Sequence, residues 1–285
     1  MDKVKEKNDK KTLKYYMFDW DDNILVMPTM IHLEHKIRDE WIKMDVTTSE
    51  FTHVRKALYD YYETDDPNSN WRFYNDTNEE SFSEFRDFGS RGKKAFLEDT
   101  QKAIQYNKFG PVWGEFIDCV IEGNIFLIIT ARGHEPRTIK QAVKWIVYNV
   151  LNKTQRNKMV RNLKKWNELF NIKDEGWDHD DYIINYLNLC SFIGIKSDWF
   201  QKKFGEQGKV SSPEKYKAIA IKYFVDKLPK FGEMLNMNIE VGFSDDDLAT
   251  VESINKYIKN ELSLEYSIDF HSYHTKDDGT KTKLD

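Results

Sequence analysis

The stretch YYMFDWDDNIL, residues 15–25, decides the fold of this 285-residue chain. Its bulky residues Tyr15 to Phe18 suit a buried strand, and they run directly into acidic residues. Carboxylates are rarely placed in a core strand, so the strand is expected to end here. Side chains at positions i and i+2 of a strand point to the same side, so Asp19 and Asp21 would face one ligand together. The stretch is either a polar turn, which Asp and Asn favour, or a functional site.

A calcium-binding loop does not fit this stretch. Asp19, Asp21 and Asn23 match the first, third and fifth positions of such a loop. The loop also requires a glycine and a bidentate glutamate, where this chain has Ile24 and Met30. What remains is a pair of carboxylates at the end of a strand.

The composition is that of a globular protein. The chain is 40% hydrophobic, which is enough for a sizeable core. Its 48 acidic residues exceed its 43 basic ones, so the composition gives no strong signal for nucleic-acid binding. Apolar runs such as 125–129 are far shorter than the roughly 20 residues that a membrane span needs, so we expect no membrane partner. Cys119 and Cys190 lie far apart in apolar surroundings, which predicts free thiols and a cytoplasmic location.

Two further predicted strands also end in polar residues. The apolar run 125–129 is followed by Thr130-Ala131-Arg132-Gly133 and then by a helix that begins near Pro136. The run 239–243 is followed by Ser244-Asp245-Asp246-Asp247 and then by a helical pattern, for which simple capping by Ser244 is the alternative explanation. Strands that alternate with helices indicate a parallel sheet, whose ligands bind outside the carboxyl ends of the strands. All three polar clusters are therefore expected on one rim.

The residues between the first two of these strands form an insertion. Residues 31–36 and 41–46 read as a hairpin, and 48–62 read as a helix with apolar residues at spacings of three and four. Residues 65–80 read as a long loop, and Phe82, Phe85 and Phe88 as a stripe of core aromatics. Further along the chain, we expect a helix at 152–170, a strand at 189–195 and an edge strand at 266–274.

The chemistry that suits three polar strand ends is phosphoryl transfer. A carboxylate can accept a phosphoryl group covalently, a second acid can protonate the leaving oxygen, and a divalent cation can neutralise the phosphate. Oxygen ligands from two strand ends suit Mg²⁺. A cation is available where Ser212-Pro213-Glu214 marks a helix start, because Lys215 and Lys217 follow in a first turn whose dipole does not favour them.

These segments resemble the motifs of the haloacid-dehalogenase-like phosphohydrolase superfamily. Residues 18–23 resemble its first motif, Asp-x-Asp after a strand, and 128–132 its second, a strand ending in Thr or Ser. A lysine at a helix start, Lys215 or Lys217, matches the third, and 241–246 resembles the acidic fourth. The four motifs occur in the family's order.

The resemblance implies a fold and a domain division. The fold would be α/β, a Rossmann-like three-layer parallel sheet with an inserted, mainly helical cap. Residues 12–27 and 112–285 would form the catalytic core, and residues 28–111 the cap insertion.

The resemblance also implies a role for each motif residue. Asp19 would be the nucleophile and a metal ligand, and Asp21 the general acid and base that lends its backbone carbonyl to Mg²⁺. Thr130 would hold phosphate oxygens, and Lys215 would balance charge, with Lys217 as the alternative. Ala131 and Arg132 would bind the substrate. Asp245 is the first choice for the metal ligand from the last strand, and Asp246 is the second.

The expected function is thus a Mg²⁺-dependent phosphatase that hydrolyses a small phosphate monoester through an aspartyl-phosphate intermediate. A narrower version acts on nucleotides or nucleic-acid ends, because the insertion is rich in aromatic residues that stack on bases. The alternative from another class is a catalytically silent protein that binds a phosphorylated ligand or serves in an assembly. Asp22 and Asn23, where the family usually has Gly and Thr, leave that alternative open.

Overall fold

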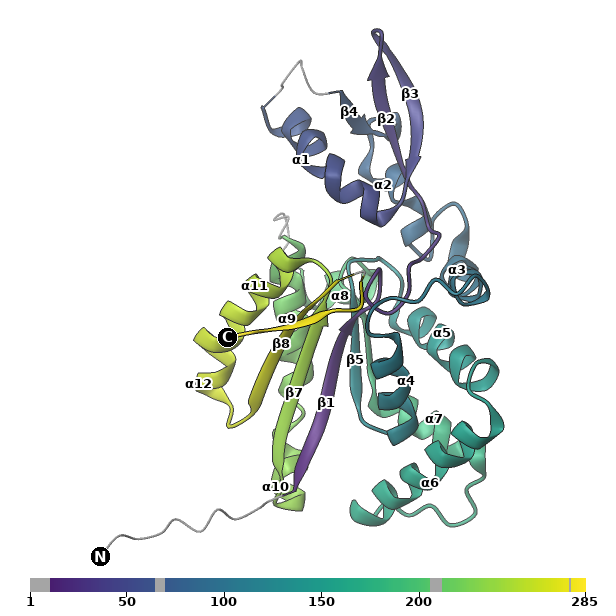
Figure 1. Ribbon diagram of the computed structural model, residues 1–285, viewed down its shortest axis with the longest axis vertical. Coiled ribbons are helices and arrows are strands. Elements are labelled where there is room, and N and C mark those ends of the chain that lie inside the picture. The colour runs from purple at the N-terminus through teal and green to yellow at the C-terminus, as the bar shows by residue number, and fades with distance from the viewer. Residues whose placement is uncertain (1–10, 65–69, 206–211, 277) are drawn as a thin grey trace, which may run out of the picture.

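The protein is described by a computed structural model that covers residues 11–64, 70–205, 212–276 and 278–285. Its centre is a six-stranded sheet in the order β6-β5-β1-β7-β8-β9 (Figure 1). The strands are parallel to their neighbours except for β9, which is antiparallel to β8. Their bounds are β1 Thr12–Asp19, β5 Phe126–Thr130, β6 Ser191–Gly194, β7 Asn238–Asp245, β8 Asp269–Thr275 and β9 Lys281–Leu284.

Helices cover both faces of this sheet. One face packs against α3, α4, α5, α6 and α7, and the other against α8, α9 and α11 (Figure 1). This confirms the prediction of an α/β fold with a mostly parallel sheet. The bounds of these helices are α3 Ala95–Gln105, α4 Trp113–Glu122, α5 Pro136–Asn149, α6 Lys153–Leu169, α7 His179–Leu189, α8 Asp198–Phe204, α9 Pro213–Val225 and α11 Leu248–Tyr257. The short helices α10 Pro229–Leu235 and α12 Ser263–Glu265 complete the carboxyl-terminal half.

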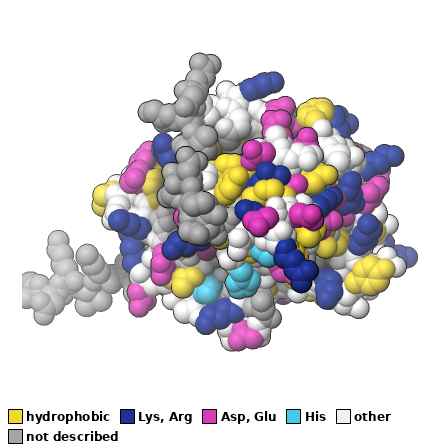
Figure 2. Space-filling model, turned by 90° about the horizontal axis from the view of Figure 1, so that it is seen from above, with side chains coloured by type: hydrophobic (Ala, Val, Ile, Leu, Met, Phe, Trp, Pro, Cys, Tyr) yellow, Lys and Arg dark blue, Asp and Glu magenta, His cyan; other side chains and the backbone are white. Residues whose placement is uncertain are grey.

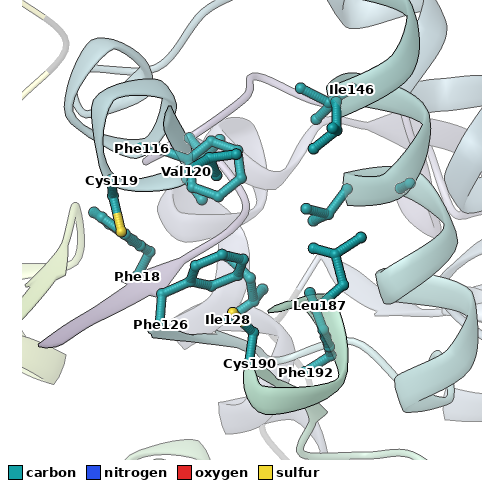
Figure 3. Close-up of a cluster of buried hydrophobic side chains, with 14 of the residues drawn as sticks. Phe18, Phe116, Cys119, Val120, Phe126, Ile128, Ile146, Leu187, Cys190 and Phe192 are labelled. Atoms are coloured by element: carbon teal, nitrogen blue, oxygen red, sulfur yellow. The ribbon is translucent and has the colours of Figure 1, made fainter. Parts of the chain in front are cut away.

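The core between the sheet and α4, α5 and α7 is built from aromatic and branched side chains. Phe126 of β5 lies edge-on to Phe116 of α4 and to Phe192 of β6, as Figure 3 shows. Cys119 and Cys190 are buried in the same cluster as free thiols, and no disulfide forms. Residues i, i+3 and i+4 of each helix supply this contact face; in α5 this pattern predicted the helix from the sequence, whereas α7 was not predicted.

The segment between β1 and α4 contains a second, three-stranded sheet in the order β3-β2-β4. Its elements are β2 Ile31–Ile37, β3 Glu40–Val46, α1 Thr48–Thr64, β4 Trp71–Phe73 and α2 Asn78–Ser81. These elements lie above the carboxyl ends of the parallel strands (Figure 1) and enclose a hydrophobic cluster of their own. In contrast, α3 packs its Phe96 and Ala103 into the main core. The predicted hairpin at 31–36 and 41–46 is confirmed.

Several local predictions need correction. The expected loop at 65–80 contains β4 and α2, because Trp71–Phe73 pair with β2; residues 65–69 lie outside the described part of the chain. Phe82 and Phe85 are buried, but Phe88 is 76% exposed, because the segment is irregular and does not continue a helical stripe. The strand expected at the edge, β8, instead lies between β7 and β9. Within the described ranges, no helix combines the length and the apolar character that crossing a bilayer requires.

Candidate active site

The polar ends of three neighbouring strands meet at one rim of the sheet, as the sequence predicts. β1 pairs with β5 so that Asp19 lies beside Ile129, one residue before Thr130. On its other side β1 pairs with β7, and Phe18 lies beside Ser244, one residue before Asp245. The parallel register alone therefore brings Asp19, Thr130 and Asp245 together.

Three carboxylates form the centre of the rim. Oxygen atoms of Asp19, Asp245 and Asp246 lie within 4.8 Å of one another. The ε-ammonium of Lys217, on α9, donates to Asp19 Oδ1 at 2.7 Å and to Asp245 Oδ2 at 2.6 Å. The side chains of Asp19, Asp245 and Lys217 are all buried. One cation thus balances three carboxylates, and the cluster keeps an excess of negative charge.

This excess of negative charge affects the pKa values of the carboxylates and of Lys217. Burial raises the pKa of Asp19 well above its ordinary value; Lys217 opposes the rise, and the neighbouring carboxylates add to it. Burial and the Asp245 carboxylate raise the pKa of Asp246 to about 8. Burial alone would lower the pKa of Lys217, but Asp19 and Asp245 outweigh it and raise that pKa. A second cation would relieve the remaining repulsion.

Lys217, and not Lys215, is the lysine at the rim. α9 buries one face, made by Tyr216, Lys217, Ala220, Ile221, Phe224 and Val225. Lys217 belongs to this face and points into the site, whereas Lys215 is exposed on the other side of the helix. The choice of Lys215 as the charge-balancing residue is therefore corrected. Ser212 caps the helix by accepting from the Lys215 backbone N–H, as the predicted helix start requires.

Asp21 lies on the other side of Asp19 and is held by Arg132. Arg132 donates from Nε and Nη2 to the Asp21 carboxylate at 2.7–3.0 Å, and the Thr130 hydroxyl donates to Asp21 Oδ2 at 3.0 Å. Asp21 is not part of the group of three carboxylates, and its backbone oxygen accepts from the Asn23 N–H at 2.6 Å. The Asp21 carboxylate thus lies apart from the three converging carboxylates, and the predicted role of its backbone oxygen as a metal ligand stays a prediction.

Arg132 is only 1% exposed, and its contacts explain why. Its Nη2 also donates to the Thr29 hydroxyl at 2.9 Å, and its guanidinium lies 4.3 Å from the centre of the Phe85 ring. Arg132 thus positions Asp21; it also lines the cleft described below, and its Nη1 has no hydrogen-bond partner among the described residues. Ala131, the other expected substrate residue, is exposed and lines the cleft described below.

Asp22 and Asn23, where the chain departs from the motif that it resembles, both make structural contacts. Asp22 adopts a left-handed backbone with φ +56°, a conformation that Gly, Asn and Asp tolerate best. Its carboxylate accepts from the Thr48 hydroxyl at 2.6 Å, which ties the start of α1 to the rim. Asn23 is fully buried; its amide donates to Ser244 O at 3.0 Å and accepts from the Thr275 hydroxyl at 2.7 Å. It fastens the turn after β1 to β7 and β8.

A cleft of about 190 Å³ lies between the rim and the inserted segment. The rim contributes the acidic residues and Lys217 to its lining, and the insertion contributes Phe51, Arg55, Tyr59 and Phe85 among others. Seen from above, the surface carries basic and acidic side chains interspersed (Figure 2), without a broad basic face. The cleft is the place where a ligand would meet Asp19.

The sequence did not point to some of the cleft residues. Lys196, Arg86 and Thr48 line the cleft, but none of them stands in a recognisable motif. The acidic cluster Asp178–Asp181 lies away from the cleft and has a structural role, because Asp178 caps α7 by accepting from the Asp180 and Asp181 N–H groups. Comparison of the chain with models of protein families, with curated proteins and with solved structures finds no match.

Proposed function

We propose that the protein is a Mg²⁺-dependent phosphatase with a haloacid-dehalogenase-like core, which hydrolyses a phosphate monoester through an aspartyl-phosphate intermediate. The observation that carries the proposal is the Lys217 bridge between Asp19 and Asp245 at the ends of two adjacent parallel strands. A buried carboxylate held beside a lysine, at the mouth of a cleft, is suited to attack a phosphate whose charge that lysine balances.

The three carboxylates also fit a hard divalent cation. Mg²⁺ prefers oxygen ligands and is commonly held by one or two carboxylates together with waters and substrate oxygens. Asp19, Asp245 and Asp246 would hold it, because their oxygens converge and their charge is incompletely balanced by Lys217. When bound, Mg²⁺ would neutralise phosphate charge at the reacting centre.

The proposed reaction gives each of these side chains one role. An Asp19 oxygen attacks phosphorus, the new O–P bond forms, and the bond to the leaving alcohol oxygen breaks. Asp21 delivers a proton to that oxygen, and it later accepts a proton from the water that cleaves the aspartyl phosphate. Lys217 stabilises the charge on the transferred group. The net change is a phosphate ester plus water giving an alcohol plus inorganic phosphate.

The contacts of Asp21 define what substrate binding must change. Thr130 and Arg132 both donate to the Asp21 carboxylate. A phosphate in the cleft would compete for the Thr130 hydroxyl, which lies directly at the end of β5. Release of that hydroxyl would let it bind the phosphate and would leave the Arg132 Nε–H as the remaining donor to Asp21 Oδ2. Arg132 keeps Asp21 oriented during the exchange.

A small phosphorylated molecule suits the size of the cleft, and a nucleotide is the narrower candidate. Aromatic side chains of the insertion, among them Phe51 and Tyr59, line the cleft opposite the rim. A base could stack on such rings. Buried free thiols at Cys119 and Cys190 support a reducing, cytoplasmic environment for the protein.

Binding of beryllofluoride separates this proposal from a catalytically silent protein. Beryllofluoride with Mg²⁺ mimics a phosphoryl group on a reactive aspartate, and bound fluorine gives resolved NMR signals. We expect such signals with the unaltered protein and their loss in Asp19→Asn. The silent alternative predicts no bound signal in either protein, and that result would count against the phosphatase.

A further inference from the structure

Two cations in the cleft have no role in the site described above. Among the cleft's other cations, Lys217 bridges Asp19 and Asp245, and Arg132 holds Asp21. Arg55 lies 3.9 Å from Asp247. Lys196 and Arg86 remain, and both line the same cleft.

These two side chains lack a strong structural partner. Within the described residues, Lys196 has no carboxylate in ion-pair range, and it rests 4.9 Å from the centre of the Phe82 ring. The carboxylate nearest to Arg86 is Glu79, at 3.7 Å, and the Glu79 side chain is 85% exposed. An exposed pair of this kind contributes little to stability. Folding therefore does not account for either cation.

Lys196 and Arg86 are held side by side by backbone contacts. The Lys196 N–H donates to Arg132 O at 3.1 Å, and Arg86 forms a parallel bridge with Gly133. The Gly133 N–H donates to Phe85 O at 2.8 Å. Both cations thus flank the turn after β5, on positions fixed by the sheet and by the insertion. Lys196 is exposed to the cleft, and partial desolvation there lowers its pKa, as does the nearby guanidinium of Arg86.

The sheet order gives their distance from the reacting centre. Lys196 follows the end of β6, and Asp19 is the last residue of β1, with β5 between them. Through Ile129 of β5, Asp19 is level with Ile193 of β6, two strand spacings or roughly 10 Å away, and Lys196 lies three residues beyond Ile193. A group bound by Lys196 and Arg86 would therefore be distinct from the phosphate at Asp19, but within reach of the same small molecule.

We propose that Lys196 and Arg86 form a second anion subsite, which binds a phosphate group of the substrate distal to the one that is hydrolysed. This inference rests on the proposed phosphatase function and narrows its substrates to small bisphosphorylated compounds. Two adjacent cations, of which Lys196 has no carboxylate partner among the described residues and Arg86 has only the exposed Glu79, form a favourable site for a dianion, because the anion also relieves their mutual repulsion. The neighbouring acidic rim repels that second phosphate and so fixes the direction in which the substrate binds.

A matched substrate pair tests the subsite. Hexane-1,6-diol bisphosphate and hexyl phosphate share the same scissile ester and differ in the distal phosphate. We expect the unaltered protein to prefer the bisphosphate in kcat/KM by about tenfold or more, which corresponds to about 1.4 kcal/mol. In Lys196→Met and in Arg86→Gln, the ratio of kcat/KM for the bisphosphate to kcat/KM for hexyl phosphate should fall towards one. Lys202 is an exposed lysine on α8, and Lys202→Met should leave this ratio unchanged. Equal kcat/KM for the pair, or a ratio unchanged by both variants, would overturn the subsite.

Calorimetric binding of the same two compounds separates this inference from the phosphatase proposal. If neither compound is hydrolysed but the bisphosphate binds more tightly and loses that advantage in Lys196→Met, the subsite stands and the phosphatase proposal fails. If hydrolysis occurs and the two compounds bind equally in every variant, the phosphatase proposal stands and the subsite fails.

Discussion

Lys217 Nζ lies 2.7 Å from Asp19 Oδ1, a contact between residues 198 positions apart in the chain. The same nitrogen lies 2.6 Å from Asp245 Oδ2, so one buried ammonium joins the ends of β1 and β7. Removing one partner of such a buried pair leaves a charge without compensation, which costs more than the pair itself contributes. The bridge is therefore both a structural joint and a reactive arrangement.

Lys217→Met should remove activity and stability together. Without the ammonium, Asp19 and Asp245 repel each other in a buried site, and we expect a loss of about 3 kcal/mol in the free energy of unfolding without Mg²⁺. The transferred phosphate would also lose its balancing charge. Lys215→Met, two residues away on the exposed side of α9, is the matched control. Urea unfolding and aryl phosphate turnover measure the two effects; equal behaviour of both variants would contradict the assignment of Lys217.

Mg²⁺ should stabilise the protein through the carboxylate cluster. A ligand that binds the folded chain at 100 times its Kd adds about 2.7 kcal/mol. We expect Mg²⁺ to raise Tm in the unaltered protein, and Asp245→Asn to abolish most of that rise. The control is Asp178→Asn, which alters a helix cap far from the cluster. A Tm rise that survives in Asp245→Asn would place the ion elsewhere.

Asn23→Ala should be strongly destabilising. The change removes the donor to Ser244 O and the acceptor for the Thr275 hydroxyl, both buried. Each unsatisfied buried group costs about 1–3 kcal/mol, so we expect a loss of about 3 kcal/mol in the free energy of unfolding. The exposed Asn188→Ala serves as control and should change it by less than about 0.5 kcal/mol. Similar unfolding curves for the two variants would refute this role of Asn23.

His134 should make the fold sensitive to mild acid. Burial lowers the pKa of His134 below its ordinary 6.5, and the nearby Arg132 lowers it further, although Asp87 opposes both. The unfolded chain then binds a proton at a higher pH than the folded one, so stability is complete above about pH 6.5 and is lost as the pH falls below it. His134→Gln should flatten the decline in the free energy of unfolding between pH 7 and 5. His53→Gln, an exposed control on α1, should leave the decline unchanged; a decline that persists in His134→Gln would exclude His134 as its source.

The strand ends of the site were predictable from the sequence because each is a local pattern. A buried apolar run followed at once by Asp, Thr or Ser marks the end of a parallel strand wherever the run lies. Lys217 could also have been recognised, because it lies three, four and seven residues before Ala220, Ile221 and Phe224 on the buried face of α9. Periodicity separates Lys217 from Lys215, and the helix start alone does not.

The remaining contacts depend on tertiary structure. The partner of Asp22 is Thr48, 26 residues away, and the partner of Asn23 is Thr275, 252 residues away. No local pattern selects these partners, because they are set by where the insertion and β8 pack against the rim. For the same reason Lys196 and Arg86 carry no signal in the sequence; their proximity follows from the bridge between Arg86 and Gly133.

Hydrolysis of 4-nitrophenyl phosphate by Asp19→Asn is the most direct test of the central claim, that Asp19 is the nucleophile of a phosphatase. Asp118→Asn, an exposed aspartate on α4, is the matched control, and circular dichroism establishes that both variants fold. With Mg²⁺ present, we predict turnover by the unaltered protein and by Asp118→Asn, and a loss of at least about 10³-fold in kcat for Asp19→Asn, because no carboxylate remains to accept the phosphoryl group. Undiminished turnover by a folded Asp19→Asn variant would contradict the account.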